Sequence, residues 1–204
     1  MEARARKRDR LSATGTEGDR AVRGPFRIVA YAIASADGMI ADETGAMPRS
    51  LGLEADQRFF EKGLDRAAVL AHGRMSQEEQ PNSPKRRRLI LTRKVAGLAP
   101  DPENPNARLW NPAGASLEEA CASLGCLSGT LAVLGGPHVY GLFLKIGYDD
   151  FYLSRADKVR LPGGVPLFGR GRPGLPEEIM SAAGLNAGPV RRLDDEVSLV
   201  EWTP

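Results

Sequence analysis

Short apolar runs alternate along this chain with segments in which apolar residues recur every three to four positions. FRIVAYAIAS (26–35), AAVLAHG (67–73) and RRRLILTR (86–93) contain apolar runs of strand length, so each predicts a buried β-strand. The segment 53–66 spaces its leucines and phenylalanines near the helical repeat and begins with acidic residues. This pattern predicts an α-helix between the first two strands.

The second half of the chain repeats the alternation. ARLWN (107–111) and YDDFYLSRAD (148–157) predict strands, and SLEEACASLGC (116–126) predicts a helix. The stretch TLAVLGGPHVYGLFL (130–144) begins as a strand and continues, after two glycines and a proline, at helical spacing. The other predicted features are a helix over 74–80, loops over 36–50 and 94–107, and a closing hairpin within 189–204.

Strands that alternate with helices imply a mostly parallel sheet with helices on both faces, and here antiparallel strands come last. The fold class is therefore predicted to be α/β. A length of 204 residues suits one domain with a tail. Residues 1–24 are charged, rich in Gly, Ser and Thr, and lack apolar periodicity. We expect them to form a disordered basic leader, followed by a single domain over 25–204.

Two local features stand out in the segment 116–126. Ser116 is placed as the N-cap of the predicted helix, with Glu119 at the capping-box position. Cys121 and Cys126, the two cysteines of the chain, lie in the same segment. Their spacing matches neither a disulfide framework nor a zinc motif, so we expect two buried thiols and no metal site.

The charge distribution excludes several classes of partner. The formal net charge is +2, which gives no strong overall field, although basic residues cluster at 4–10 and 85–88. Aromatic residues do not alternate with these arginines as a base-stacking surface requires, so we expect no nucleic-acid partner. Neither a membrane-spanning run nor a secretory signal is present in the sequence, so we expect no membrane partner and a cytoplasmic protein.

Three predicted strand ends carry residues suited to phosphate. Gly135 and Gly136 follow one strand, HGRMS (72–76) closes a second with a glycine, a cation and a hydroxyl, and LTR (91–93) closes a third. Helix N-termini and glycine backbones at the ends of parallel strands bind phosphate groups, because N–H groups point outward and no Cβ intervenes.

The third strand end also indicates which nucleotide is bound. An arginine beside a hydroxyl, as in Thr92 and Arg93, suits a ribose 2′-phosphate. The combination favours NADPH over NADH. The G-x-G-x-x-G motif of ordinary dinucleotide-binding sites is absent from the sequence.

Seven segments in one order resemble the dihydrofolate reductase superfamily. The resemblance covers the chain from residue 26 to the C-terminus, and ASADGMIA is most similar to the reductase domain of the bifunctional riboflavin-biosynthesis deaminase–reductase. The H-x-E and P-C-x-x-C motifs of the fused zinc deaminase do not occur. The matching segments are DGMIA, MP, LEADQRFF, HGRMS, RRRLILTR, VLGGPHVY and FYLSRAD.

The resemblance implies a dihydrofolate-reductase-like fold and a cofactor cleft. In this superfamily a cis peptide bond joins the two glycines, which bends the strand end around the cofactor pyrophosphate. The residues that the strand ends and the resemblance together assign to NADPH are Ile33, Ile40, Ala41, Met47, Gly73, Arg74, Ser76, Thr92, Arg93, Gly135, Gly136, Pro137, His138, Val139 and Tyr140.

The resemblance also places a substrate site. Asp56 falls where classical members hold the heterocycle with a carboxylate, and Ser154 matches the hydroxyl that meets it. A carboxyl group in an apolar cleft has a raised pKa, which suits proton control beside a ring. Phe60 lies one turn beyond on the same helix face and is placed to stack on the ring. Arg86 and Arg49 are further candidates for substrate binding, and the KRRR segment that contains Arg86 faces either an anionic substrate tail or solvent.

These features predict an NADPH-dependent reductase of a pyrimidine- or pteridine-type substrate, with the hydride passed to the heterocycle or to its opened sugar adduct. Riboflavin-pathway-like pyrimidine reduction is the leading hypothesis, and dihydrofolate reduction is the alternative. Arg49 replaces the tryptophan that follows Met-Pro in classical reductases, and Met39 replaces the lysine usual in riboflavin-pathway domains. Because of these two departures, the chain could instead be a nucleotide-binding module without catalytic activity, and this alternative stays open. The resemblance further implies a homodimer and a small heterocyclic ligand.

Overall fold

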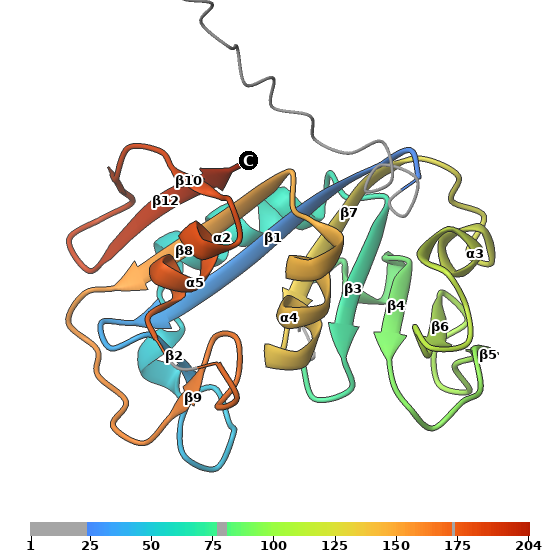
Figure 1. Cartoon of the computed structure of the whole chain (residues 1–204), viewed down its shortest axis with the longest axis horizontal. Helices are drawn as coiled ribbons and strands as arrows, with labels where there is room; N and C mark the ends of the chain where they lie inside the picture. The colour runs from blue at the N-terminus through green and yellow to red at the C-terminus, as the bar shows by residue number, and fades with distance from the viewer. Residues whose placement is uncertain (1–23, 77–80, 173) are drawn as a thin grey trace, which may run out of the picture.

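The computed structural model describes residues 24–76, 81–172 and 174–204 (Figure 1). The predicted leader, residues 1–24, lies outside the described residues except for its last position, so both the leader and the domain boundary after it stay predictions.

Within the described residues, ten strands form one sheet in the order β10-β12-β8-β1-β7-β3-β4-β6-β5, with β11 paired to β12. The six strands from β8 to β6 are parallel to their neighbours, whereas β5, β10, β11 and β12 pair antiparallel. The predicted mostly parallel sheet with an antiparallel C-terminal hairpin is confirmed. The strands are β1 Phe26–Ser35, β3 Val69–Gly73, β4 Arg88–Leu91, β5 Leu98–Pro100, β6 Ala107–Trp110, β7 Gly129–Gly135, β8 Asp150–Ala156, β10 Asn186–Ala187, β11 Arg191–Arg192 and β12 Val197–Thr203.

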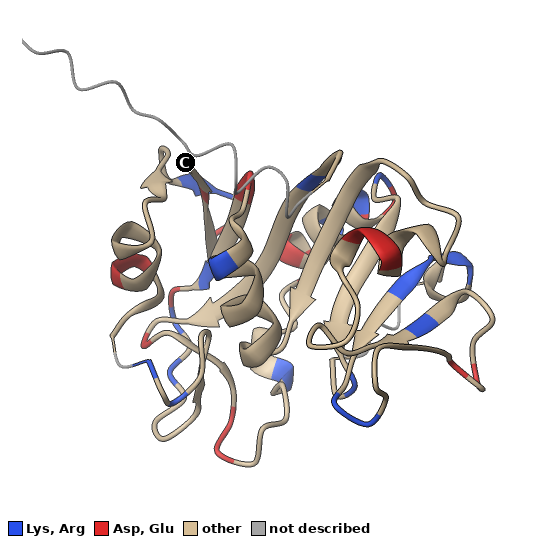
Figure 2. Ribbon diagram, turned by 45° about the vertical axis from the view of Figure 1, so that its right-hand side comes forward, with Lys and Arg blue, Asp and Glu red and all other residues tan. Residues whose placement is uncertain are grey.

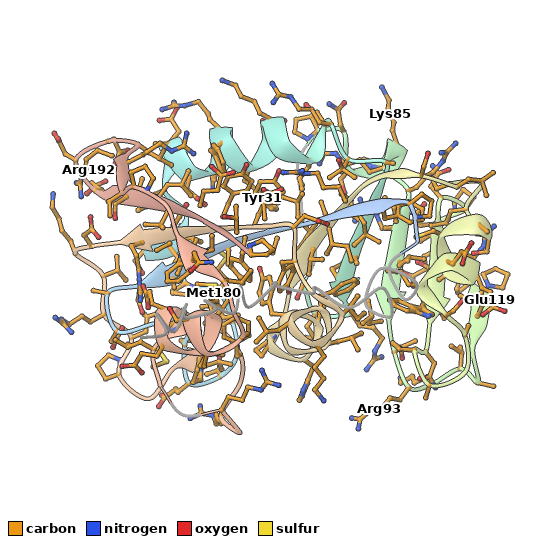
Figure 3. The ribbon with its side chains drawn as sticks, turned by 45° about the horizontal axis from the view of Figure 1, so that its top comes forward. Tyr31, Lys85, Arg93, Glu119, Met180 and Arg192 are labelled. Atoms are coloured by element: carbon orange, nitrogen blue, oxygen red, sulfur yellow. The ribbon has the colours of Figure 1, made fainter. Side chains whose placement is uncertain are left out.

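Helices cover both faces of the sheet. Figure 3 shows α2 on one side of the sheet, and α4 and α5 on the other. The first face packs the α2 residues Ala55 and Leu64 against strand residues, while the second face buries the apolar sides of α3, α4 and α5 in the largest core cluster. The helices are α2 Glu54–Leu64, α3 Leu117–Ala122, α4 Pro137–Ile146 and α5 Pro176–Ala182, with short 3₁₀ turns η1 Arg49–Leu51 and η2 Ser83–Lys85.

The central strands are buried on both faces, which explains their nearly continuous apolar sequence. In β1, Ile28, Ala30 and Ala34 are inaccessible to solvent and lie in the larger core. Ile33 faces the opposite way and joins a smaller cluster with Leu51. A strand covered by helices on both sides must be apolar at successive positions rather than at alternate ones.

The structure corrects four element predictions. Residues 74–76 form a turn rather than the start of a helix, and the rest of the predicted 74–80 helix lies outside the described residues. The predicted loop 94–107 contains β5, an antiparallel edge strand held by β6. The predicted loop 36–50 contains β2 (Met39–Ala41), which pairs with β9 (Val165–Pro166) in a separate small sheet. Helix α5 carried no periodic signal strong enough for us to predict it.

The helix predicted over 116–126 ends early but keeps its predicted start. Ser116 Oγ accepts a hydrogen bond from Glu119 N at 3.1 Å, and the Glu119 carboxylate accepts one from Ser116 N at 2.8 Å. Cys126 lies beyond the helix end, where its N–H donates to Cys121 O at 3.1 Å. Both thiols are buried, as expected. Among the described residues, none of the helices has the length and apolar character needed to cross a membrane.

The capping box generates a stability prediction. Ser116→Ala leaves the N–H of Glu119 without its side-chain acceptor, and we expect it to lower the free energy of unfolding by about 1 kcal/mol. Urea-induced unfolding followed by circular dichroism measures this change. Ser128→Ala, at an exposed loop position, is the matched control. Equal unfolding midpoints for the two variants would contradict the role of the cap.

Candidate active site

A cleft of about 1520 Å³ opens at the edge of the sheet where β3, β4 and β7 end. Parallel strands share one polarity, so the segments that follow them leave at the same edge. Helix α2 and the 3₁₀ turn η1 line one end of the cleft, and β2 with the loop after it lines another wall. Figure 2 shows basic residues on loops at this edge of the molecule.

The three predicted phosphate-binding segments meet in this cleft. Gly73 closes β3 and lies against the backbone of the two glycines after β7: a Cβ placed on it would lie 3.7 Å from Gly136 N. A Cβ on Gly136 would lie 3.5 Å from Ser76 Oγ, so the second strand end also reaches the glycines. Thr92 and Arg93 line the same cleft. The segments 73–76, 92–93 and 136–138 therefore form one continuous surface.

Glycine is required at positions 135 and 136 for two different structural reasons. The peptide bond between Gly135 and Gly136 is cis, as the resemblance implied. Gly135 has a φ of +98°, and a Cβ there would lie 2.6 Å from the ring of Tyr140. Gly136 is instead the N-cap of α4 and faces the cleft. Gly135 therefore makes room for the buried ring of Tyr140, while Gly136 leaves backbone open to the cleft.

Helix α4 starts at this point without a side-chain cap. Its N-cap is Gly136, Pro137 occupies the first turn, and no side chain accepts from the first N–H groups. The exposed His138 lies beside them. Free N–H groups and the positive end of the helix dipole stabilise a bound anion. Arg93 and Lys94 add exposed cations on the neighbouring strand end, and Figure 3 shows Arg93 pointing outward at this edge.

The other end of the cleft holds a carboxyl group. Helix α2 places Asp56 in its first turn, facing the sheet, where its side chain hydrogen-bonds to Ser154 on β8. Burial raises the pKa of Asp56 to about 6, and the Ser154 hydrogen bond only partly offsets the shift. Of the described residues that line the cleft, Asp56 is the single acidic one.

Tyr140 connects the two ends of the cleft. Its hydroxyl donates to the backbone oxygen of Tyr31 at 2.5 Å, and its ring packs against Phe151. Burial raises the pKa of Tyr140, and the nearby Asp56 carboxylate raises it further. Tyr140 therefore stays a neutral hydrogen-bond donor that ties α4 to the middle of β1.

Aromatic rings line the cleft beyond Asp56. Tyr31 stacks on Tyr152 at a centroid distance of 5.3 Å, and Phe59 meets Tyr152 edge-on at 5.2 Å. Phe60 packs edge-on against Tyr31 at 6.1 Å and lines the cleft as predicted. Such edge-on and offset arrangements favour a flat ring as the ligand of this end.

Sequence reasoning missed several lining residues on these elements. Tyr31, Phe59 and Tyr152 were not predicted as site residues, although Tyr152 precedes Ser154 by two positions on β8. Side chains two positions apart in a strand point to the same face, so the spacing of Tyr152 and Ser154 could have predicted that Tyr152 lines the cleft. Gln57 and Lys94 also line the cleft without having been predicted.

Arg86 is a correction. Its guanidinium pairs with Asp65 at 2.6 Å, beyond the C-terminal end of α2, and it does not line the cleft. Arg86 therefore pairs with an acidic residue outside the cleft and does not occupy the substrate-binding position that was predicted for it. All the other predicted site residues except Gly135 line the cleft: Ile33, Ile40, Ala41, Met47, Arg49, Asp56, Phe60, Gly73, Arg74, Ser76, Thr92, Arg93, Gly136, Pro137, His138, Val139, Tyr140 and Ser154.

Comparisons with known proteins identify the fold. No family model and no curated protein matches the sequence. A pyrimidine reductase-like protein of Corynebacterium diphtheriae superimposes with a TM-score of 0.61 at 14% identity, covering 90% of this chain and 94% of that one. Dihydrofolate reductase from Enterococcus faecalis, complexed with NADP(H) and RAB-propyl, gives a TM-score of 0.54 at 18% identity over 87% and 95% of the chains. The chain has a dihydrofolate reductase-like fold.

A third structure with this fold is a two-activity protein, a deaminase and a reductase. It is the diaminohydroxyphosphoribosylaminopyrimidine deaminase/5-amino-6-(5-phosphoribosylamino)uracil reductase of Thermotoga maritima, with a TM-score of 0.58 at 17% identity. The superposition covers 89% of this chain but 57% of that one. At these identities the likeness establishes the dihydrofolate reductase-like fold, and the roles of the cleft residues stay predictions. Within the described residues, no cluster of His, Cys, Asp and Glu is arranged to hold a metal ion.

The raised pKa of Asp56 generates a test of its burial. Folding favours the protonated carboxyl, so the native protein loses stability as the pH rises from the unfolded pKa, 3.8, through the folded pKa, about 6. Asp56→Asn is neutral throughout and escapes this loss. Relative to Asp56→Asn, we expect the free energy of unfolding of the unmodified protein to fall by about 2 to 3 kcal/mol between about pH 4 and pH 7. Urea unfolding at matched pH values measures the difference, and parallel pH profiles would contradict it.

Proposed function

We propose that this protein is an NADPH-dependent reductase that transfers hydride to a pyrimidine- or pteridine-type heterocyclic substrate, either on the ring or on an opened sugar attached to it. One observation carries the proposal: a single cleft joins a phosphate-adapted edge of the sheet to a buried carboxyl group surrounded by aromatic rings. The first part suits a phosphorylated nucleotide, and the second suits a flat ring that exchanges a proton. A cleft that continues from one to the other allows the two ligands to meet.

The cofactor end fits NADPH. The backbone at Gly73 and Gly136 and the start of α4 would hold the pyrophosphate, because both glycines line the cleft without a side chain and no side chain caps the helix. Thr92 and Arg93 would hold the 2′-phosphate, since a guanidinium and a hydroxyl match its oxygens. When bound, NADPH supplies the hydride, and the protein supplies alignment.

The substrate end manages a proton and the orientation of the ring. With a pKa of about 6, Asp56 is mostly ionised at neutral pH but exchanges its proton readily. As a carboxylate it accepts hydrogen bonds from ring N–H groups, while Ser154 and the α2 backbone hold its position. Phe60 and Tyr31 offer faces and edges for stacking, and Ile33 excludes water beside them.

We favour riboflavin-pathway-like pyrimidine reduction over dihydrofolate reduction. Arg86 aligns with the arginine that binds the folate carboxylate in classical reductases, yet here it pairs with Asp65 outside the cleft. Arg49 lines the cleft instead and is placed for an anionic substituent. A cytoplasmic homodimer, which the resemblance implies, belongs to the same proposal.

Turnover with a panel of substrates tests the proposal. We expect steady oxidation of NADPH, followed by its absorbance, in the presence of a phosphoribosylaminouracil and less with dihydrofolate. Turnover only with dihydrofolate would reverse the order of the two substrates. Tight NADPH binding without turnover of any ring would support the nucleotide-binding module that Met39 and Arg49 keep open. Failure to bind NADPH would overturn the whole proposal.

Cofactor selectivity gives a separate prediction for Arg93. Arg93→Ala removes one charge-assisted contact to the 2′-phosphate, so we expect NADPH binding to weaken about 10- to 100-fold while NADH binding is unchanged. Fluorescence titration with both nucleotides measures the two dissociation constants. Arg66→Ala, at an exposed arginine outside the cleft, is the matched control. An equal loss for NADPH and NADH would place Arg93 away from the 2′-phosphate.

A further inference from the structure

One wall of the cleft lies outside the main sheet. Ile40 and Ala41 of β2 line the cleft, and β2 pairs with β9 through Met39–Pro166 and Ala41–Val165. Its position therefore depends on the segment 159–167 as well as on its neighbour β1, so whatever fixes that segment to β2 also fixes the cleft wall.

Two backbone contacts and one close approach dock this segment. Ala36 N donates to Val159 O at 2.7 Å, and Leu167 N to Gly38 O at 3.4 Å. Gly164 is buried against β2, because a Cβ on it would lie 2.5 Å from Ala41 O. These contacts bring the two segments together, but they are ordinary backbone pairings that leave the register of β2 to be set by something further.

A side-chain network supplies that constraint. Asp37 accepts from Leu161 N through both carboxylate oxygens, at 3.0 and 3.1 Å, and from Ser35 Oγ at 2.5 Å. Ser35 Oγ in turn accepts from Met39 N, the first residue of β2, at 3.0 Å. Partial burial acts to raise the pKa of Asp37, yet the bonds from Ser35 and Leu161 outweigh it and hold the pKa below its usual value.

The network is anchored at the far end of β8. Arg155 Nη1 donates to Ser35 O at 2.7 Å, while its Nε donates to Glu177 of α5 at 2.8 Å. Ser35 is completely buried, so neither of its bonds is exchanged readily with water. The carboxylate of Asp37 thus connects β1, the start of β2 and the segment 159–167 to a fixed point of the fold.

The resemblance assigns Ile40 and Ala41 of this cleft wall to the NADPH site. On the proposed function, the hydride donor must lie beside the ring that Asp56 binds, and therefore far from the phosphates at Arg93 and Gly136. We propose that Asp37 and Ser35 are positioning residues that hold Ile40 and Ala41 against the nicotinamide half of NADPH and contribute nothing to its phosphate half. Neither side chain lines the cleft, so both act through β2.

Two ligands distinguish binding at the nicotinamide half of the cofactor site from binding at its phosphate half. NADPH touches both ends of the cofactor site, whereas adenosine 2′,5′-bisphosphate reaches only the strand ends. Asp37→Asn keeps the size of the side chain but loses the charge-assisted bonds, and we expect NADPH to bind about 10-fold more weakly, with adenosine 2′,5′-bisphosphate changed less than about 2-fold. Isothermal titration calorimetry on the full chain measures both constants.

Matched variants make the result specific. Asp65→Asn is the same change at a carboxylate outside the cleft, bonded to Arg86, and we expect it to alter neither constant. Ser35→Ala breaks the same network at the Ser35 hydroxyl. If Asp37→Asn does not fold, Ser35→Ala is the variant in which we expect NADPH binding to weaken while adenosine 2′,5′-bisphosphate binding is kept. Glutamate at position 37 (Asp37→Glu) keeps the charge and should bind NADPH more tightly than Asp37→Asn does.

The outcomes distinguish this inference from the proposed function. If the unmodified protein binds neither ligand, the proposed function is wrong. If it binds both, and the two network variants weaken both equally or neither, the positioning role is wrong while the proposed function stands. A selective loss of NADPH binding in Asp37→Asn or Ser35→Ala supports the role.

Discussion

The parallel pairing of β7, β3 and β4 is the constraint on which the rest of the structure depends. Strands of one polarity end at one edge, so three segments distant in sequence present their glycines, hydroxyls and cations on a shared surface. Helix α4 starts at the same place without a side-chain cap, so the positive end of its dipole faces this edge. The glycine-rich, basic end of the cleft follows from topology, with little dependence on any single side chain.

At the opposite end of the cleft, the chemical character of the site comes from the burial of Asp56. Asp56 is held against the sheet by α2, in a setting of aromatic and aliphatic side chains where a charge is poorly solvated. The cations at the strand ends are exposed and screened by water. One cleft therefore contains an electropositive, solvated end and a desolvated end with a proton-exchanging group. Tyr140, bonded to Tyr31 O, spans the boundary between them.

The sheet alone does not complete the cleft. Its third wall, β2, belongs to a small separate sheet with β9, and the Ser35–Asp37 network connects that wall to β8 and α5. The C-terminal part of the chain thus contributes to the site mainly by supporting β2, and through Val165 it also lines the cleft itself. The segment 159–167, for which no helix or strand was predicted, gains its structural role from β2, the element that it holds.

The amino-acid sequence by itself determined the α/β class, most strand positions, the capping box at Ser116 and the residues of the three strand ends, because apolar periodicity and local hydrogen bonding are short-range properties. It left open which side chains meet. Arg86 was predicted at the substrate, but only the tertiary structure placed Asp65 beside it. The raised pKa of Asp56, the ring behind Gly135 and the support of β2 were likewise decided by tertiary structure, because desolvation and close packing depend on neighbours far away in the chain.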